Sequence, residues 1–140
     1  MIVLDTNVVS ELMRIKPDAA VLGWFNQQNS DTLWLNSIVA AELLYGIARL
    51  PDGARKQQLA RAITAMLEDD FGSRVAAFDL ASASIYATLV ADRERAGQPV
   101  AMADAQIAAI CLAHSATLAT RNQRHFANLG VQLIDPWNAD

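Results

Sequence analysis

Three carboxylates stand alone in otherwise uncharged stretches of this chain. Each is the only charged residue of its stretch, with histidine counted as neutral: Asp5 in 1–10, Glu42 in 32–48 and Asp104 in 96–120. A carboxylate buried in an apolar interior is strongly destabilising unless a cation or hydrogen-bond donors compensate its charge. Because none of the three stretches supplies a cation, we expect the carboxylates to meet one another around a metal ion.

The chemistry of this donor set favours a hard divalent cation. Carboxylate oxygens without histidine or thiolate are typical ligands of Mg²⁺ or Mn²⁺, which usually keep several bound waters. Each residue also has a simpler interpretation: Asp5 could cap a helix, Glu42 could pair with a distant arginine, and Asp104 could be an ordinary acid in the first turn of a helix. The three together favour the metal site.

The elements that must position these residues alternate between strand and helix. Short apolar or alternating runs predict strands at 2–5, 32–37, 74–79, 117–120 and 131–135. Helical spacing of apolar residues predicts helices at 7–14, 19–28, 38–50, 54–70, 80–97 and 103–115. This alternation predicts an α/β sandwich with a mainly parallel sheet, formed by one domain covering residues 1–140.

The predicted elements place Asp5 where ligands bind in such sheets, beyond the carboxyl end of a strand. Asp5 ends the first strand, and Thr6 or Asn7 is expected to cap the helix that follows. Glu42 falls in the middle of the predicted helix 38–50. Asp104 falls in the first turn of the predicted helix 103–115.

Composition limits the classes of function. The chain has 140 residues, of which 53% are hydrophobic and 19% charged, and its net charge is −4, which argues against non-specific binding of phosphate backbones. Its single cysteine, Cys111, predicts neither disulfides nor a zinc site, so we expect a reducing, cytoplasmic location. The alanine-rich stretch 96–120 contains Gly97, Pro99 and Asp104, and we interpret it as a buried helix with its flanks, with no association with a membrane.

Four stretches, in order and spacing, resemble those of a known family. MIVLDTNVVSEL, SIVAAELLYGIARL, MADAQIAAIC and TLATRNQRHFANLGVQLIDPW are similar to the motifs of PIN-domain ribonucleases, specifically the VapC toxins of the FitB-like group. The resemblance runs from residue 2 to Trp137. It implies a PIN-like three-layer sandwich, with a central, mainly parallel sheet flanked by helices.

The resemblance also implies a function and a set of site residues. Toxins of this group are metal-dependent endoribonucleases that form homodimers and are inhibited by a cognate VapB-like antitoxin. Asp5, Glu42 and Asp104 would be the acidic ligands of Mg²⁺ or Mn²⁺. Further residues are implied around them: Thr6 and Asn7 would orient the first carboxylate, and Thr120 and Asn122 would lie at the rim of the site.

One departure concerns the fourth motif. PIN proteins often carry a further aspartate either where this chain has Asn122 or three residues later, where it has His125. Neutral asparagine and a titratable histidine offset less cation charge than an aspartate does. The sequence therefore leaves open whether one or two metals bind, and whether His125 binds metal, holds a phosphate or simply faces solvent.

The hypothesis is hydrolysis of RNA by a metal-activated water. The candidate RNA contacts are arginines close to the motifs in sequence, namely Arg14, Arg49 and Arg121. The helix pair 38–70 is a candidate antitoxin groove, because Leu43, Tyr45 and Ile47 exceed the apolar residues that one core face needs.

Two other functions remain open from the sequence. An acid-metal phosphatase could also begin with a strand ending in aspartate, although Asn7 stands where its second aspartate would be. A catalytically silent partner-binding domain is the other, and it should bind Mg²⁺ or Mn²⁺ weakly or not at all.

Overall fold

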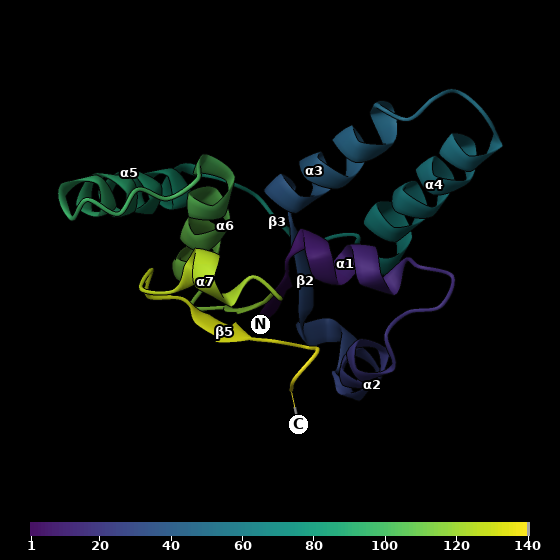
Figure 1. Cartoon of the computed structure of the whole chain (residues 1–140), viewed down its shortest axis with the longest axis horizontal. Helices are drawn as coiled ribbons and strands as arrows, with labels where there is room; N and C mark the ends of the chain where they lie inside the picture. Colours follow the sequence, from purple (N-terminus) through teal and green to yellow (C-terminus); the bar gives the residue numbers. More distant parts are fainter. Residues whose placement is uncertain (140) are drawn as a thin grey trace.

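A five-stranded parallel sheet forms the centre of the molecule, shown in a computed structural model that describes residues 1–139 (Figure 1). The strands are β1 (Ile2–Leu4), β2 (Leu33–Asn36), β3 (Val75–Ala76), β4 (Thr117–Ala119) and β5 (Gln132–Ile134). Their order is β3-β2-β1-β4-β5, and every neighbouring pair is parallel. The predicted α/β class with a parallel sheet is confirmed. The predicted domain 1–140 includes Asp140, which lies outside the described residues.

Helices connect the strands. They are α1 (Thr6–Leu12), α2 (Ala19–Gln27), α3 (Ser37–Ala48), α4 (Ala54–Ala65), α5 (Leu80–Arg95), α6 (Met102–Ala113) and α7 (Gln123–Phe126), with a 3₁₀ turn η1 (Ser30–Thr32) and a π-helical turn η2 (Met66–Phe71). The chain steps outward from β1 to β2 to β3 and then returns to β4. Right-handed crossovers therefore place α1 to α4 on one face of the sheet and α5 and α6 on the other, and Figure 1 shows these two groups on opposite sides of the molecule.

Two predicted elements had wrong boundaries, each for a local reason. The predicted helix 54–70 leaves α geometry after Ala65, because the N–H of Gly72 bonds back to the carbonyl of Leu67 in a wider turn. The predicted strand 74–79 is only β3, because the N–H of Phe78 donates to the hydroxyl of Ser37 instead of to a strand. The short η1 and α7 were not predicted.

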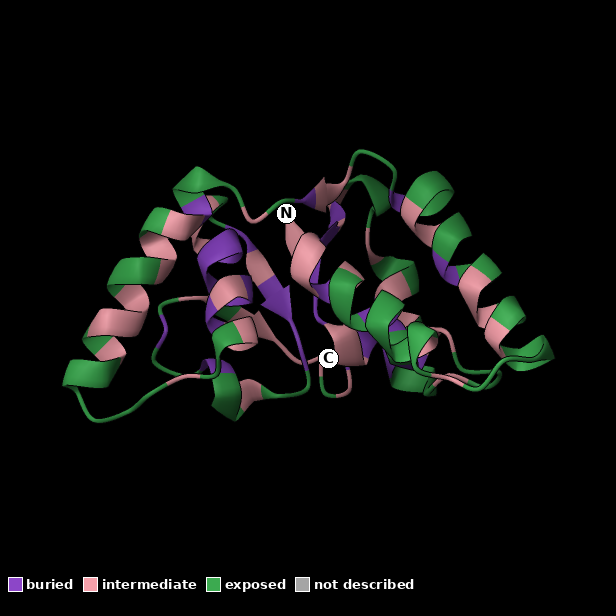
Figure 2. Cartoon of the chain, turned by 90° about the horizontal axis from the view of Figure 1, so that it is seen from above, coloured by how far each residue is buried: buried purple, intermediate pink, exposed green. Residues whose placement is uncertain are grey.

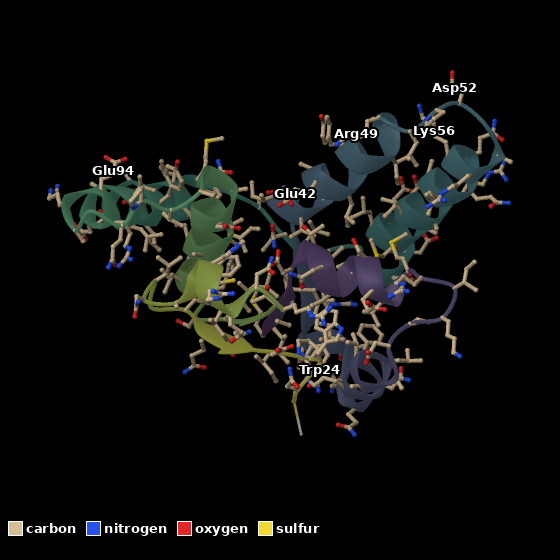
Figure 3. All side chains as sticks on the ribbon, in the orientation of Figure 1. Trp24, Glu42, Arg49, Asp52, Lys56 and Glu94 are labelled. Atoms are coloured by element: carbon tan, nitrogen blue, oxygen red, sulfur yellow. The ribbon has the colours of Figure 1, made fainter. Side chains whose placement is uncertain are left out.

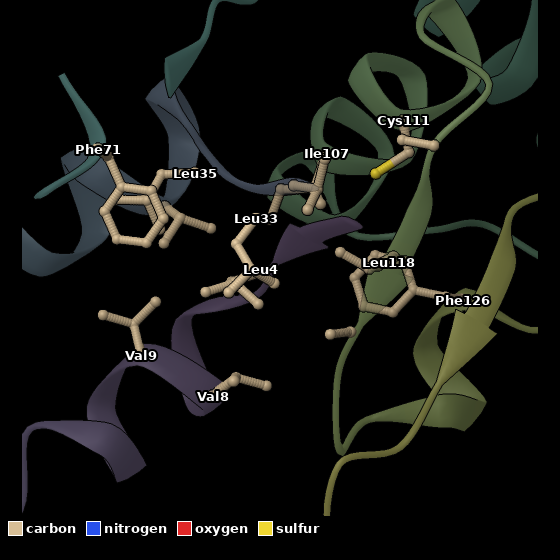
Figure 4. Close-up of a cluster of buried hydrophobic side chains, with 14 of the residues drawn as sticks. Leu4, Val8, Val9, Leu33, Leu35, Phe71, Ile107, Cys111, Leu118 and Phe126 are labelled. Atoms are coloured by element: carbon tan, nitrogen blue, oxygen red, sulfur yellow. The ribbon is translucent and has the colours of Figure 1, made fainter. Parts of the chain in front are cut away.

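The core surrounds the central strands β1, β2 and β4, and both α6 and the helices α1 to α4 contribute side chains to it. Figure 2 shows buried backbone concentrated in the middle of the molecule, while α4 and α5 expose their outer faces. Leu4, Leu118 and Phe126 are almost completely buried, as is Ile107 of α6 (Figure 4). Burial raises the pKa of the Cys111 thiol in the same cluster to about 12, which leaves it unreactive.

No helix within residues 1–139 is both long and apolar enough to span a bilayer. The alanine-rich stretch is instead α6, whose residues Ala105 and Ile107–Cys111 are buried in the core, as the sequence predicted.

Candidate metal centre

Asp5 lies at the point where the central strand ends. Its backbone N–H donates to the carbonyl of Ala119, which keeps it in register with the neighbouring strand β4. Its Oδ1 accepts the N–H of Thr6 at 2.8 Å, so Asp5 itself caps α1, and the expectation that Thr6 or Asn7 would do so was wrong. Only 6% of Asp5 is exposed. Oδ1 of Asp5 therefore caps α1, and Oδ2 remains available to the site.

Thr120 holds the second oxygen of this carboxylate. It follows β4, is fully buried, and donates its hydroxyl to Asp5 Oδ2 at 2.7 Å. The same hydroxyl oxygen accepts the N–H of Asn122 at 3.0 Å and the amide of Asn7 at 3.3 Å. Thr120 was predicted at the rim of the site, but it lies inside, because the parallel register puts the end of β4 directly beside the end of β1.

Asn7 links the carboxylate to the loop after β4. Its Nδ2 lies 3.5 Å from Asp5 Oδ2, and its Oδ1 accepts the backbone N–H of Arg121 at 3.2 Å. The expectation that Thr6 and Asn7 orient the first carboxylate therefore agrees with their hydrogen bonds.

Glu42 reaches the site from the second turn of α3. Figure 3 shows it on the part of α3 that lies towards α6. The residue as a whole is exposed, but its carboxyl group is partly shielded, and this loss of hydration raises the pKa of Glu42. The negative charge of Asp5, and less strongly that of Asp104, raises it further, while the hydroxyl of Thr6 opposes the rise.

Asp104 lies in the first turn of α6, as predicted. Partial burial raises its pKa, the nearby His125 opposes this, and the charge of Asp5 adds to the rise. His125 Nδ1 lies 3.6 Å from Asp104 Oδ2, with 60% of the histidine side chain and 25% of the aspartate side chain exposed. Asp5, Glu42 and Asp104 are thus near enough to repel one another, and no arginine or lysine within residues 1–139 pairs with any of them.

The residues present fit a hard divalent cation by the chemistry of their donors. In this conformation no three Asp, Glu, His or Cys side chains of residues 1–139 are gathered closely enough to share an ion. Mg²⁺ does not require such a cage, because it usually binds one or two carboxylates and keeps several waters. The hydroxyl of Thr6 is buried, lies close enough to the Glu42 carboxylate to lower its pKa, and is a further oxygen at this point.

Asn36 is a residue of this edge that the sequence analysis did not single out. It ends β2, is fully buried, and accepts the N–H of Val39 with its side chain at 2.9 Å, which fixes the start of α3 and hence the position of Glu42. Asn36 fell inside the predicted strand 32–37, and asparagine shortly before a helical run is a recognised N-cap signal that could have identified it.

The three candidate RNA arginines differ in their surroundings. Arg14 lies beyond the far end of α1 and pairs with the buried Glu11 at 3.2 Å, so the structure places it away from Asp5. Arg49 follows α3, about 10 Å along the helix axis from Glu42, and lies over the ring of Tyr45 (Figure 3). Arg121 follows Thr120 directly and is the only one of the three bonded to the network around Asp5.

The candidate antitoxin groove is only partly exposed. Leu43 is buried in the core and Ile47 packs against it, so these two do not exceed the needs of the core. Tyr45 is 65% exposed, and Leu44 beside it is 47% exposed. The apolar surface of α3 is therefore formed by these two residues.

The raised pKa values predict how stability changes with pH in the absence of metal. The folded protein binds the protons of Glu42 and Asp104 more tightly than the unfolded chain does, so stability falls as pH rises from the ordinary carboxyl range through the raised values. Glu42→Gln removes one of these groups. In EDTA we expect this variant to gain stability relative to the wild type as pH rises from about 4.5 upward, measured by thermal unfolding.

Glu94, exposed on α5 and outside the site, provides the control for this measurement (Figure 3). An equal pH-dependent gain in Glu94→Gln would contradict the assignment of the effect to the three facing carboxylates.

Known proteins match this chain along nearly its whole length. The PIN domain family model matches residues 2–131. The chain is 45% identical to the plasmid stability protein StbB of Pseudomonas syringae pv. tomato over 99% of this chain and all of that protein. It is 40% identical to the VapC ribonuclease Y4jK of Sinorhizobium fredii, with 98% of each covered, and 36% identical to Toxin FitB of Neisseria gonorrhoeae, with 99% of each covered. The crystal structure of FitAcB from Neisseria gonorrhoeae superposes with a TM-score of 0.92, at 36% identity and 99% coverage of both chains.

Proposed function

The chain belongs to the PIN domain family, and from this premise we propose that it is the toxin of a VapBC-type toxin–antitoxin pair, an endoribonuclease that depends on Mg²⁺ or Mn²⁺. One observation carries the proposal: carboxylates that follow β1 and lie on α3 and α6 come together at the carboxyl edge of the sheet, where the charge of Asp5 raises the pKa of both Glu42 and Asp104. Such an arrangement is unfavourable without a cation. The VapC ribonuclease and the toxin to which the chain is similar support this activity.

The chain's own residues have distinct roles in this reaction. Asp5 is held by the N–H of Thr6 and the hydroxyl of Thr120, so its second oxygen enters the site in a fixed position. Glu42 and Asp104 approach from two helices and complete the negative charge that would hold the ion. When bound, the divalent cation supplies an acidified water and stabilises charge on the phosphoryl oxygens.

The partners belong to the same proposal. We infer a VapB-like antitoxin as inhibitor, a homodimer of this chain as the assembly, and the cytoplasm as the location. The exposed Tyr45 and Leu44 on α3 are apolar surface that an antitoxin helix could cover.

The acid-metal phosphatase is disfavoured by Asn7. A phosphatase of that type carries a second aspartate two residues after the first, at the position of Asn7 in this chain. Here both ends of the Asn7 amide are used in hydrogen bonds to Asp5, Thr120 and Arg121, and an amide cannot supply a proton.

RNA cleavage by purified, antitoxin-free protein tests the proposed function. We expect cleavage with Mg²⁺ or Mn²⁺, loss of cleavage in EDTA, its return when metal is added back, and inhibition by the cognate antitoxin. A folded protein that neither cuts RNA nor is stabilised by either metal would contradict the proposal and favour the silent partner-binding domain.

A further inference from the structure

Arg121 is a charged residue beside the candidate metal centre whose charge is not compensated. It is exposed, and no carboxylate within residues 1–139 forms an ion pair with it. Its backbone N–H donates to Asn7, and Asn7 in turn contacts the carboxylate of Asp5. The backbone of Arg121 is therefore fixed relative to the acidic centre.

The side chain of Arg121 is held from the other direction by Trp137. The guanidinium carbon lies 4.8 Å from the centroid of the Trp137 ring, within the range of a cation–π contact. Among residues 1–139 the only hydrogen bond of Arg121 uses its backbone N–H, and an arginine that lies on an aromatic ring can still offer its guanidinium N–H donors to a phosphate. We propose that Trp137 positions Arg121 as a phosphate-binding group for the RNA substrate, an inference that rests on the proposed ribonuclease function.

The position of Trp137 is itself determined by the sheet. β5, which pairs with β4, ends at Ile134, and the next residue, Asp135, forms a tight turn. Asp135 Oδ1 accepts the N–H of Trp137 at 3.0 Å, and Asp135 Oδ2 accepts the amide of Asn138 at 3.0 Å. The ring also packs against the hydrophobic core. Trp137 is thus a fixed platform, so a guanidinium lying on it loses little further freedom when it binds a phosphate.

The surface next to Arg121 has room and charge for a nucleic-acid backbone. The segment 121–125 lines an open hollow of about 510 Å³ that also contains Arg124 and His125. A second hollow, of about 300 Å³, shares Arg124 and His125 with the first and includes Asp104. The two hollows therefore adjoin at Arg124 and His125, between Arg121 and Asp104.

Because the chain as a whole is acidic, the position of its basic side chains matters for RNA binding. The protein carries a net charge of −4, so an RNA strand is repelled unless basic groups are concentrated where it binds. Two arginines elsewhere are partly neutralised, since Arg14 pairs with Glu11 and Arg95 pairs with Asp92. Arg121 and Arg124 lie beside the centre without such partners among the described residues, and arginine binds phosphate oxygens in a bidentate manner.

Binding of RNA without cleavage measures this role. In an Asp5→Asn background, we would follow the affinity for a labelled single-stranded RNA of mixed sequence over a range of salt concentrations. Arg121→Gln and Trp137→Leu are each expected to weaken binding about tenfold and to reduce the slope of log K against log salt by about 0.7, the value for one phosphate contact to a single strand.

The matched controls separate positioning from stability. Trp137→Phe keeps an aromatic face and is expected to retain most of the affinity and the full salt slope, while Arg14→Gln removes an arginine outside the site and should change neither. Thermal unfolding identifies any variant that is simply unfolded. If Trp137→Leu is unfolded, the results for Arg121→Gln and Trp137→Phe decide whether the proposal holds. An unchanged salt slope in Arg121→Gln overturns the proposal, as does a loss of affinity in Trp137→Leu with the slope unchanged.

Two further binding measurements identify the ligand. Single-stranded DNA of the same sequence tests whether the site takes phosphates from either nucleic acid, and binding of DNA but not RNA would overturn the proposal. We would also measure binding of the antitoxin to Arg121→Gln. Loss of antitoxin binding, with the salt slope for RNA unchanged, would overturn the proposal. Cleavage by the wild type is measured separately: a protein that binds RNA through Arg121 but does not cut it refutes the proposed function and leaves this inference standing.

Discussion

Asp5→Asn is expected to reduce metal-dependent RNA cleavage by about 10²- to 10³-fold, the cost of removing one preorganised electrostatic group from a catalytic site, while the protein remains folded. Asparagine retains an oxygen that can accept the N–H of Thr6 and is as good an N-cap as aspartate, so α1 should still start at the same residue. The variant loses the negative charge, and with it one of the oxygens that would hold the cation.

The same substitution should distinguish loss of cation binding from loss of folding stability. Without metal, Asp5→Asn should be no less stable than the wild type, because the charge of Asp5 raises the pKa of both Glu42 and Asp104. Added Mn²⁺ should raise the unfolding temperature of the wild type and raise that of the variant much less. Asp31→Asn, at an exposed position before β2, provides the control. Equal stabilisation of both proteins by Mn²⁺, or undiminished cleavage by Asp5→Asn, would contradict the assignment of Asp5 as a metal ligand.

Leu118→Ala is expected to destabilise the protein by about 3 kcal/mol or more, because it removes a fully buried side chain and leaves a cavity. Leu118 lies in the middle of β4, next to Val3 of β1, within the cluster of Figure 4. The loss should lower the unfolding temperature by roughly 10 °C. It should also loosen the site, because β4 carries Thr120 to its contact with Asp5.

Leu80→Ala is the matched control for this change. It is chemically the same substitution, but Leu80 is 86% exposed at the start of α5, so we expect little change in stability. Denaturant unfolding of the two variants measures the difference. A loss in Leu80→Ala as large as that in Leu118→Ala would show that burial is not the cause.

The sequence predicted well what depends on local pattern. The apolar run 2–5 and the alternating strand and helix signals identified the parallel α/β fold, because strands buried on both faces and amphipathic helices differ in periodicity. The boundaries that failed, after Ala65 and after Ala76, depend on single hydrogen bonds that no periodicity records. The placement of Asp104 in the first turn of a buried helix followed from the apolar residues after it.

The sequence by itself indicated which residues can form the acidic centre, because a lone carboxylate in an apolar stretch is costly where the fold buries it. Only the tertiary structure decided how they are held. Thr120 lies 115 positions from Asp5 along the chain and reaches it only because β1 and β4 are parallel neighbours. Trp137 reaches Arg121 for the same reason, since β5 pairs with β4. Local pattern encodes burial and periodicity, whereas contacts between distant segments follow from the order and register of the strands, which are set by the packing of the whole sheet.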